Sequence, residues 1–155
     1  MTKPGIVRTG KEFDLDRLLF QFDQAWQSLP PPRIEDYLAL LGQTGDRGPP
    51  TRRELLEELV KIDLEYRWRQ PDSAARQSGW KPRPCLEDYL GRYPDLAPLN
   101  RMPLELIGVE YRVRRRWGDR PNHDSYANRF PKHGSELQQL LQSINADLAT
   151  KAPAR

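Results

Sequence analysis

The chain has 155 residues, of which 37% are hydrophobic and 30% are charged, and it contains one cysteine, Cys85. This length fits one domain with a narrow core, and a single cysteine excludes an internal disulfide. The apolar runs are too short to span a bilayer, and the first residues lack the apolar stretch of a signal peptide, so we expect a cytoplasmic protein that does not enter a membrane. The net charge of +3 is too balanced to indicate nucleic-acid binding by itself.

Residues 1–10 show no periodic pattern, and we expect them to be disordered. After them, apolar residues recur at helical spacing in four long segments, at 15–29, 51–69, 104–117 and 135–148. No segment alternates with a period of two, so the predicted fold class is all-α. We place a single helical domain at 11–149, with an apparent insertion at 70–82 and a disordered tail at 150–155.

A short motif containing a tyrosine follows each of the first three long segments. Tyr37, Tyr89 and Tyr126 each come two residues after an acid and four residues before a large apolar residue. Prolines precede all three copies and follow the second and third, where they favour the start and the end of a helix. Because residues four apart share a helix face, we expect each tyrosine to pack inward on the preceding long helix.

The predicted repeating unit is therefore a long helix, a turn and a short helix. Six of the nine residues in 59–67 match their counterparts in 104–112, and this alignment makes Tyr66 and Tyr111 equivalent. Self-similarity at a period of tens of residues is typical of stacked helical repeats, although the uneven spacing of the tyrosines makes this repeat degenerate. We predict about seven helices arranged as degenerate helix–turn–short-helix repeats.

Arginine and tryptophan gather where two of the long segments end. Five arginines and Trp117 lie within residues 112–120, and the second segment ends in Arg67-Trp68-Arg69. Cations stabilise a helix C-terminus, so a solvated structural face is one interpretation. An exposed surface that binds a protein partner is another, and a grip on phosphates with Trp117 stacking on a base is a third. The residues predicted for partner binding are Arg67, Trp68, Arg112, Arg114, Arg115, Arg116 and Trp117.

No pattern in the sequence indicates catalysis. The acids beside Tyr89 could form an acid–base site, but an element that occurs three times is better explained as structural. His123 and His133 lack further ligands at the spacing that a metal requires. A phosphate loop, a nucleophile elbow and a dinucleotide fingerprint are also missing. We therefore expect a protein that is not an enzyme and holds no cofactor or metal.

Two stretches carry a resemblance to a known family. Residues 53–69 with 84–94, and residues 110–121, resemble the helical region ahead of the catalytic domain in many planctomycete serine/threonine protein kinases. The kinase motifs themselves (Gly-x-Gly-x-x-Gly, His-Arg-Asp and Asp-Phe-Gly) do not occur, so no catalytic residue is carried over. The resemblance implies a non-catalytic protein-interaction or regulatory module in bacterial Ser/Thr kinase signalling, with a kinase domain or its substrate as the partner. The alternative is a nucleic-acid-binding helical domain that uses residues 112–120.

Overall fold

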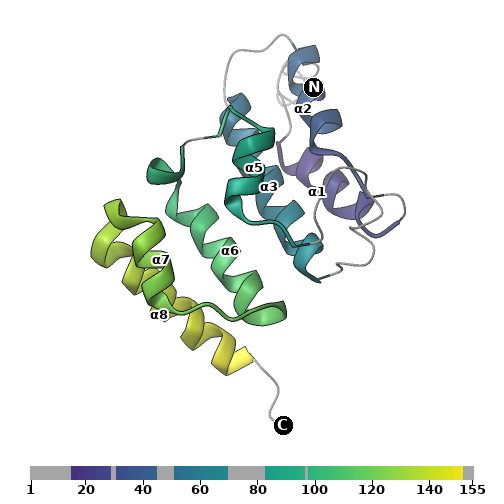
Figure 1. Cartoon of the computed structure of the whole chain (residues 1–155). Coiled ribbons are helices and arrows are strands. Elements are labelled where there is room, and N and C mark those ends of the chain that lie inside the picture. The colour runs from purple at the N-terminus through teal and green to yellow at the C-terminus, as the bar shows by residue number, and fades with distance from the viewer. Residues whose placement is uncertain (1–14, 29–30, 45–50, 70–82, 97, 152–155) are drawn as a thin grey trace, which may run out of the picture.

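The computed structural model describes residues 15–28, 31–44, 51–69, 83–96 and 98–151 (Figure 1). Its α-helices are α1 (Leu15–Ala25), α2 (Ile34–Thr44), α3 (Arg52–Arg69), α5 (Leu86–Arg92), α6 (Leu104–Trp117), α7 (His123–Arg129) and α8 (Gly134–Lys151). Two 3-10 turns, η2 (Leu99–Arg101) and η3 (Pro131–His133), precede α6 and α8. Within these ranges there is no strand, and the all-α prediction is confirmed.

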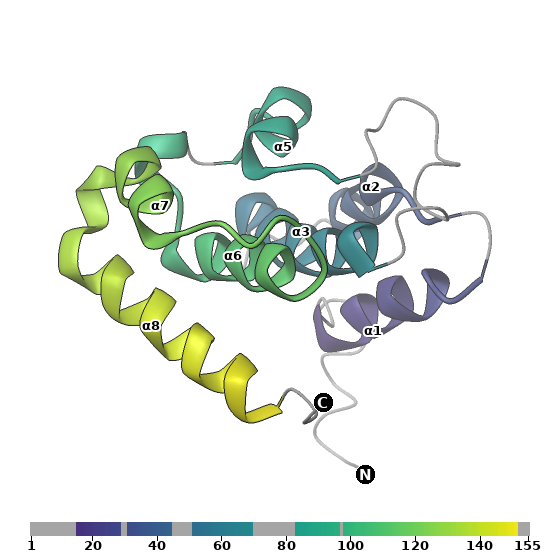
Figure 2. The ribbon, with the colours of Figure 1, turned by 60° about the horizontal axis from the view of Figure 1, so that its bottom comes forward.

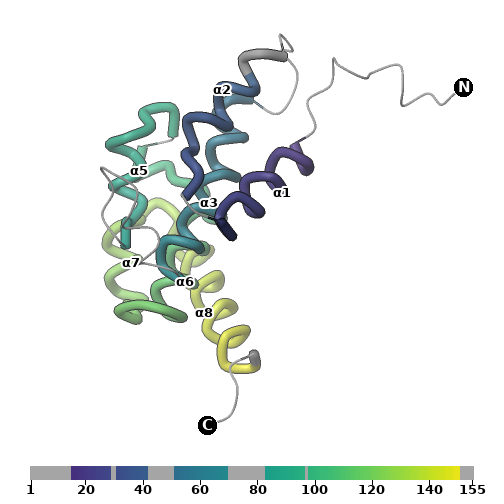
Figure 3. Tube along the Cα trace, turned by 90° about the vertical axis from the view of Figure 1, so that its right-hand side faces the viewer, coloured from purple at the N-terminus to yellow at the C-terminus, as the bar shows by residue number. Residues whose placement is uncertain are grey.

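Helices α3 and α6 pack side by side at the centre of the molecule. Figure 2 shows α5 on one side of this pair, with α1 and α8 toward the other side. Figure 3 shows that α5 and α7 lie on the same side of the pair, opposite α1. Helix α8 packs on α6, and α2 packs on α3, so each of the two central helices is covered on several faces.

The hydrophobic core runs continuously from Phe22 in α1 to Leu141 in α8. Tyr89 and Tyr126 are fully buried in it, as expected from their position one turn into the short helices. Tyr37 is half-buried and meets the edge of the Phe22 ring, with the ring centroids 4.9 Å apart. The tyrosines of the second and third motifs therefore anchor α5 and α7, while the first lies at the margin of the core.

Local capping signals fix where several helices begin. At the start of α3, the Thr51 N–H donates to Glu54 Oε1 at 2.8 Å, and the Glu54 N–H donates to Thr51 Oγ1 at 3.1 Å. This reciprocal pair is a capping box, which satisfies backbone N–H groups that have no partner inside the helix. At the start of α7, Asn122 accepts a hydrogen bond from the Ser125 N–H.

The structure corrects the alignment of α3 with α6. The sequence match pairs Glu65 with Glu110, yet Glu65 is exposed whereas Glu110 is fully buried. Burial pairs Glu110 with Asp63 instead, since both carboxylates are 0% exposed. The shift of two residues makes the predicted equivalence of Tyr66 and Tyr111 wrong, although both rings are buried. Packing decides which face turns inward, and similar residue strings can lie on different faces.

Some boundaries differ from the prediction or fall outside the description. Helix α8 continues to Lys151, two residues beyond the domain end expected at 149, and α1 ends at Ala25. The segments 1–10 and 70–82 lie outside the described residues. No helix in the described part of the chain is both long enough and apolar enough to cross a lipid bilayer.

Candidate functional site

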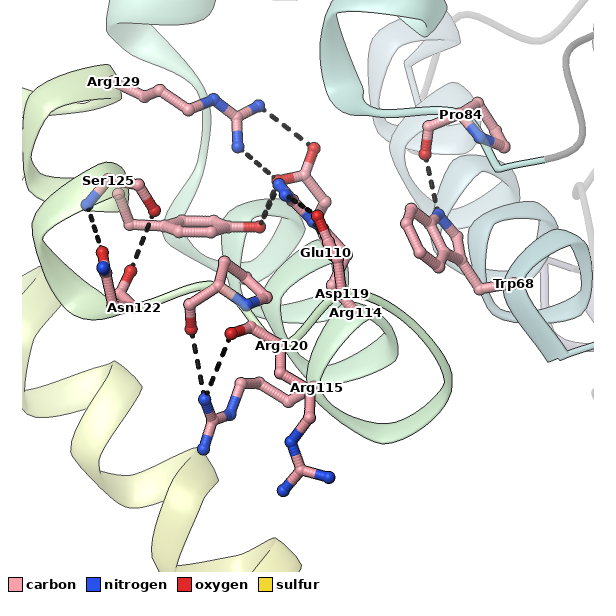
Figure 4. Close-up of polar contacts among 12 residues, drawn as sticks. Trp68, Pro84, Glu110, Arg114, Arg115, Asp119, Arg120, Asn122, Ser125 and Arg129 are labelled. Atoms are coloured by element: carbon pink, nitrogen blue, oxygen red, sulfur yellow. Dashed lines mark hydrogen bonds and ion pairs between the residues drawn. The ribbon is translucent and has the colours of Figure 1, made fainter.

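Two of the residues predicted to bind a partner are buried. The side chains of Arg67 and Trp68 belong to the core, with 1% and 5% exposure, because the last turn of α3 is covered by neighbouring segments. Arg67 Nε lies 2.5 Å from Asp63 Oδ2. Trp68 Nε1 donates to the backbone carbonyl of Pro84 at 2.8 Å (Figure 4). The expectation that these two side chains are exposed is therefore wrong.

Three arginines of α6 make contacts within the fold. Arg114 donates to both carboxylate oxygens of Asp119, at 3.0 and 2.6 Å, and so closes the turn that follows α6 (Figure 4). Arg115 reaches two backbone carbonyls of the same turn, at 3.5 and 3.3 Å. Arg112 crosses to α8 and donates to Asp147 at 2.8 Å. These contacts favour the structural interpretation for Arg114 and Arg115.

Cationic residues and one tryptophan near the C-terminal ends of α3 and α6 form a set that we call the basic surface. It consists of Arg69, Arg116, Trp117, Arg120 and Arg83, whose Cζ lies 5.6 Å from the centroid of the Trp68 ring. Guanidinium groups lie over the Trp117 ring, with the Arg116 Cζ 4.9 Å and the Arg69 Cζ 5.8 Å from the ring centroid. Arg116 and Arg120 are exposed, and no acidic side chain of the described residues lies within ion-pair distance of either. Arg116 and Trp117 were among the residues predicted for partner binding. Arg69 and Arg120 lie in the two basic stretches noted in the sequence, and Arg83 is an addition.

The first buried carboxylate, Asp63, joins α3 to α5. The Tyr89 hydroxyl donates to Asp63 Oδ2 at 2.6 Å, and Arg67 shares the same oxygen. Burial and the neighbouring Asp63 charge raise the pKa of Tyr89 well above its ordinary value. A phenol and a carboxylate held in this way are sealed in the core, so the network stabilises the fold and offers no acid–base site to a substrate.

The second buried carboxylate, Glu110, joins three helices. It accepts hydrogen bonds from the Tyr126 hydroxyl and from the Leu86 N–H, the latter at 2.7 Å. Figure 4 shows Arg129 beside Glu110, to which its Nη1 donates at 2.6 Å. Arg114 Nη1 lies 3.6 Å away. The donors come from the start of α5, from α6 itself and from α7. Glu110 therefore connects α5, α6 and α7, a role that the sequence analysis did not predict. The signal for it in the sequence was a carboxylate within an apolar helical stripe.

One cluster has the residue types of a metal site. Possible ligand atoms of Cys85, Glu87 and Glu110 lie within 4.8 Å of one another. Arg129 already bridges the two carboxylates, at 2.6 Å from each. Burial and the charge of Glu110 raise the pKa of the Cys85 thiol to about 11, whereas a metal requires the thiolate. The guanidinium occupies the place of a cation, and the cluster does not fit a metal.

An apolar groove of about 350 Å³ lies between α6 and α8. Its lining comes from one residue of α3, five of α6 and two of α8: Lys61, Leu104, Glu105, Gly108, Val109, Arg112, Leu140 and Ile144. A Cβ at Gly108 would lie 3.2 Å from Leu140 Cδ2 and 3.4 Å from Ile144 Cδ1, so the glycine lets α8 come close. The groove depends on how α8 crosses α6, which helical periodicity does not reveal.

Charged residues stand at both ends of this groove. Lys61 Nζ lies 2.7 Å from Glu105 and 2.9 Å from Glu58, near the start of α6. The hydrogen bond from Lys61 lowers the pKa of Glu105. Arg112 stands one turn beyond Gly108 and remains 39% exposed despite its pair with Asp147. The arrangement can hold apolar side chains in the middle and charged ones at the ends.

Comparisons with protein-family models, curated proteins and solved structures find no match to this chain. The resemblance to the helical region of planctomycete kinases therefore stays a prediction.

Proposed function

We propose that this chain is a non-catalytic protein-interaction module whose α6–α8 groove binds one face of an amphipathic helix of a partner protein. The observation that carries the proposal is the apolar groove of about 350 Å³. In keeping with the resemblance, we propose that the partner is a kinase domain or a kinase substrate in bacterial Ser/Thr signalling.

The direction of the groove supports a helix as the occupant. Leu104, Gly108 and Arg112 follow one another at four-residue spacing, so they form one row along α6. At 1.5 Å per residue this row is about 12 Å long. A row of that length accommodates two or three side chains of a helix, spaced at i, i+3 or i+4, and i+7.

The charges at the end of the row favour one chemistry for the partner. Arg112 is half-exposed where the apolar lining ends, so its guanidinium can donate hydrogen bonds to a second carboxylate besides that of Asp147. A helix with apolar anchors followed by Asp or Glu would satisfy both features. We therefore propose an amphipathic helix that is acidic at the end near Arg112.

The fate of the buried carboxylates supports the non-catalytic part of the proposal. Asp63 and Glu110 are each engaged by a tyrosine and an arginine, and neither lines the groove. An acid–base role would require an acid within hydrogen-bonding reach of a bound substrate. The groove offers contact surface instead.

A selection experiment tests the proposal. A phage-displayed library of amphipathic helices of about 18 residues is selected against the whole chain. Enriched peptides should carry apolar residues at helical spacing with acids at one end. Val109→Glu, which places a carboxylate in the groove, should weaken their binding at least about tenfold. Leu40→Glu is the matched control, because Leu40 is an exposed apolar residue of α2 outside the groove.

Circular dichroism would first establish that both variants keep their helices. Failure to enrich any amphipathic peptide would contradict the proposal. So would enriched peptides that bind the Val109→Glu variant as tightly as the unchanged chain.

A further inference from the structure

We infer that the basic surface (Arg69, Arg83, Arg116, Trp117 and Arg120) binds an acidic polypeptide segment that continues from the helix in the groove. The assignment of this segment to the same partner rests on the proposed function. The acidic specificity of the surface rests on the contacts of the surface itself.

The basic surface begins where the groove ends. Arg116 is four residues after Arg112, so it extends by one turn the row of α6 that lines the groove. Trp117 and the end of α3 adjoin it, since Arg69 lies over the Trp117 ring. A chain leaving the groove in this direction would pass directly over the basic surface.

The charges on this surface are not balanced by its own acids. Arg69 has a partner in Glu65, with Nη1 3.4 Å from Oε2. Asp119 is held by Arg114, which does not belong to the surface. Arg116 and Arg120 face solvent with no acidic side chain of the described residues within ion-pair distance. Arg116 and Arg120 therefore leave a positive charge of about two for a ligand to neutralise, in addition to Arg83, whose charge acts on Asp119.

The stacked geometry suits carboxylates. The Arg116 and Arg69 guanidinium groups rest on the indole of Trp117, at 4.9 and 5.8 Å from its centroid. Stacking restrains both long side chains. Arg69 already donates to Glu65, whereas the N–H groups of Arg116 remain available for paired hydrogen bonds to a carboxylate. Little rotamer entropy is then lost when an Asp or Glu binds.

The same geometry disfavours a nucleic acid. A single strand binds by stacking its bases on exposed aromatic rings, and two guanidinium groups already lie over Trp117. Electrostatic affinity for a nucleic acid also grows with the number of phosphates that are neutralised, and four arginines would neutralise few of them. We therefore assign the surface to an acidic peptide.

Fluorescence anisotropy tests the inference, with a labelled peptide of alternating Glu and Gly as the probe and the whole chain as the receptor. Binding should weaken markedly when salt rises from about 50 to about 200 mM. The double variant Arg116→Glu/Arg120→Glu should bind the probe at least about tenfold more weakly. Arg33→Glu/Arg101→Glu makes the same change in net charge at two exposed arginines outside the surface, and it should bind nearly as the unchanged chain does.

The failures of the two proposals can be distinguished. Val109→Glu should leave binding of the acidic probe unchanged, because the groove takes no part in it. Absence of probe binding at low salt, or equal binding by the two double variants, would overturn the acidic assignment while leaving the groove unaffected. A single-stranded oligothymidine that binds more tightly than the acidic probe, and is lost in Arg116→Glu/Arg120→Glu, would overturn it in favour of nucleic acid.

Discussion

The two buried carboxylates of this protein are built alike but differ in how tightly they are enclosed. Asp63 and Glu110 each accept a hydrogen bond from the tyrosine of the next short helix. Each also has an arginine four residues later on its own helix, Arg67 and Arg114. The Arg67 side chain is only 1% exposed, whereas that of Arg114 is 16% exposed.

The longer side chain of Glu110 reaches more hydrogen-bond donors than Asp63 does, so the loss of one contact at the second site leaves others in place. Glu110 reaches the Leu86 N–H at the start of α5 and the guanidinium of Arg129 in α7, besides Arg114. Arg114 and Arg129 have further acidic partners, Asp119 and Glu87. Asp63 binds its cation inside the core, so loss of one partner leaves the other without access to water.

In the first pair of helices, α1 and α2, an aromatic ring takes the place of the buried carboxylate. Phe22 of α1 faces Tyr37 of α2 edge to face, where α3 and α6 face their tyrosines with acids. Packed apolar residues often stabilise a core at least as well as a buried ion pair. The acids are therefore not needed to attach a short helix, and their effect is best measured by removing them one at a time.

The largest effect is expected at the enclosed site. Asp63→Ala should lower the free energy of unfolding by about 3–5 kcal/mol, because the charge of Arg67 stays in the core without its carboxylate. Urea unfolding measures this loss. Glu65→Ala, on the exposed face of the same helix, should change the free energy of unfolding by less than about 0.5 kcal/mol. A loss at Asp63 as small as that at Glu65 would show that the pair contributes little.

Glu110→Ala should cost less, about 2–3 kcal/mol, because Arg129 keeps Glu87 and Arg114 keeps Asp119. Adding Glu87→Ala should then cost more than the same change costs alone, since Arg129 would lose both partners. A double-mutant cycle in urea gives this coupling. A larger loss at Glu110 than at Asp63 would reverse the comparison.

Removal of the tyrosine hydroxyls should have smaller effects that are nearly equal at the two sites. Tyr89→Phe and Tyr126→Phe should each lower the free energy of unfolding by about 1–2 kcal/mol, because each loses a buried hydrogen bond to a carboxylate. Tyr37→Phe, at the half-buried first motif, should change it by less than about 0.5 kcal/mol. Thermal unfolding of the three variants ranks them, and equal losses at all three would contradict the account.

The smallest effect is expected on the solvent side of α5. Nothing lies within 4 Å of a Cβ built on Gly91, which is exposed inside this helix. Gly91→Ala should therefore raise the free energy of unfolding by about 0.5–1 kcal/mol through helix propensity alone. Asn128→Ala is the matched change in α7, two residues after its tyrosine, and should stabilise less. A decrease at Gly91 would indicate a contact that the packing of α5 does not account for.

The sequence predicted features that depend on neighbouring residues along the chain. Apolar spacing and proline positions located the helices, and the Tyr89 and Tyr126 motifs were correctly expected to pack inward. The burial of Arg67 was missed because it depends on a partner one turn away in the core. Its position four residues after Asp63, within an apolar stripe, was the usable signal.

The groove could not be predicted in the same way. In the sequence, Leu104 and Leu140 have the helical spacing of ordinary core residues. They line a groove because of the way in which α8 crosses α6 at Gly108. The two-residue shift between α3 and α6 has the same origin. Helix periodicity shows that a face is apolar, whereas tertiary packing decides how fully it is covered.

Methyl NMR of the whole chain, titrated with a peptide selected for groove binding, tests the central claim most directly. We predict that the methyl resonances of Val109, Leu140 and Ile144 shift progressively as the peptide binds, while the methyls of Leu40 stay unchanged. Shifts confined to α2, or a bound peptide that leaves the groove methyls unperturbed, would contradict the account.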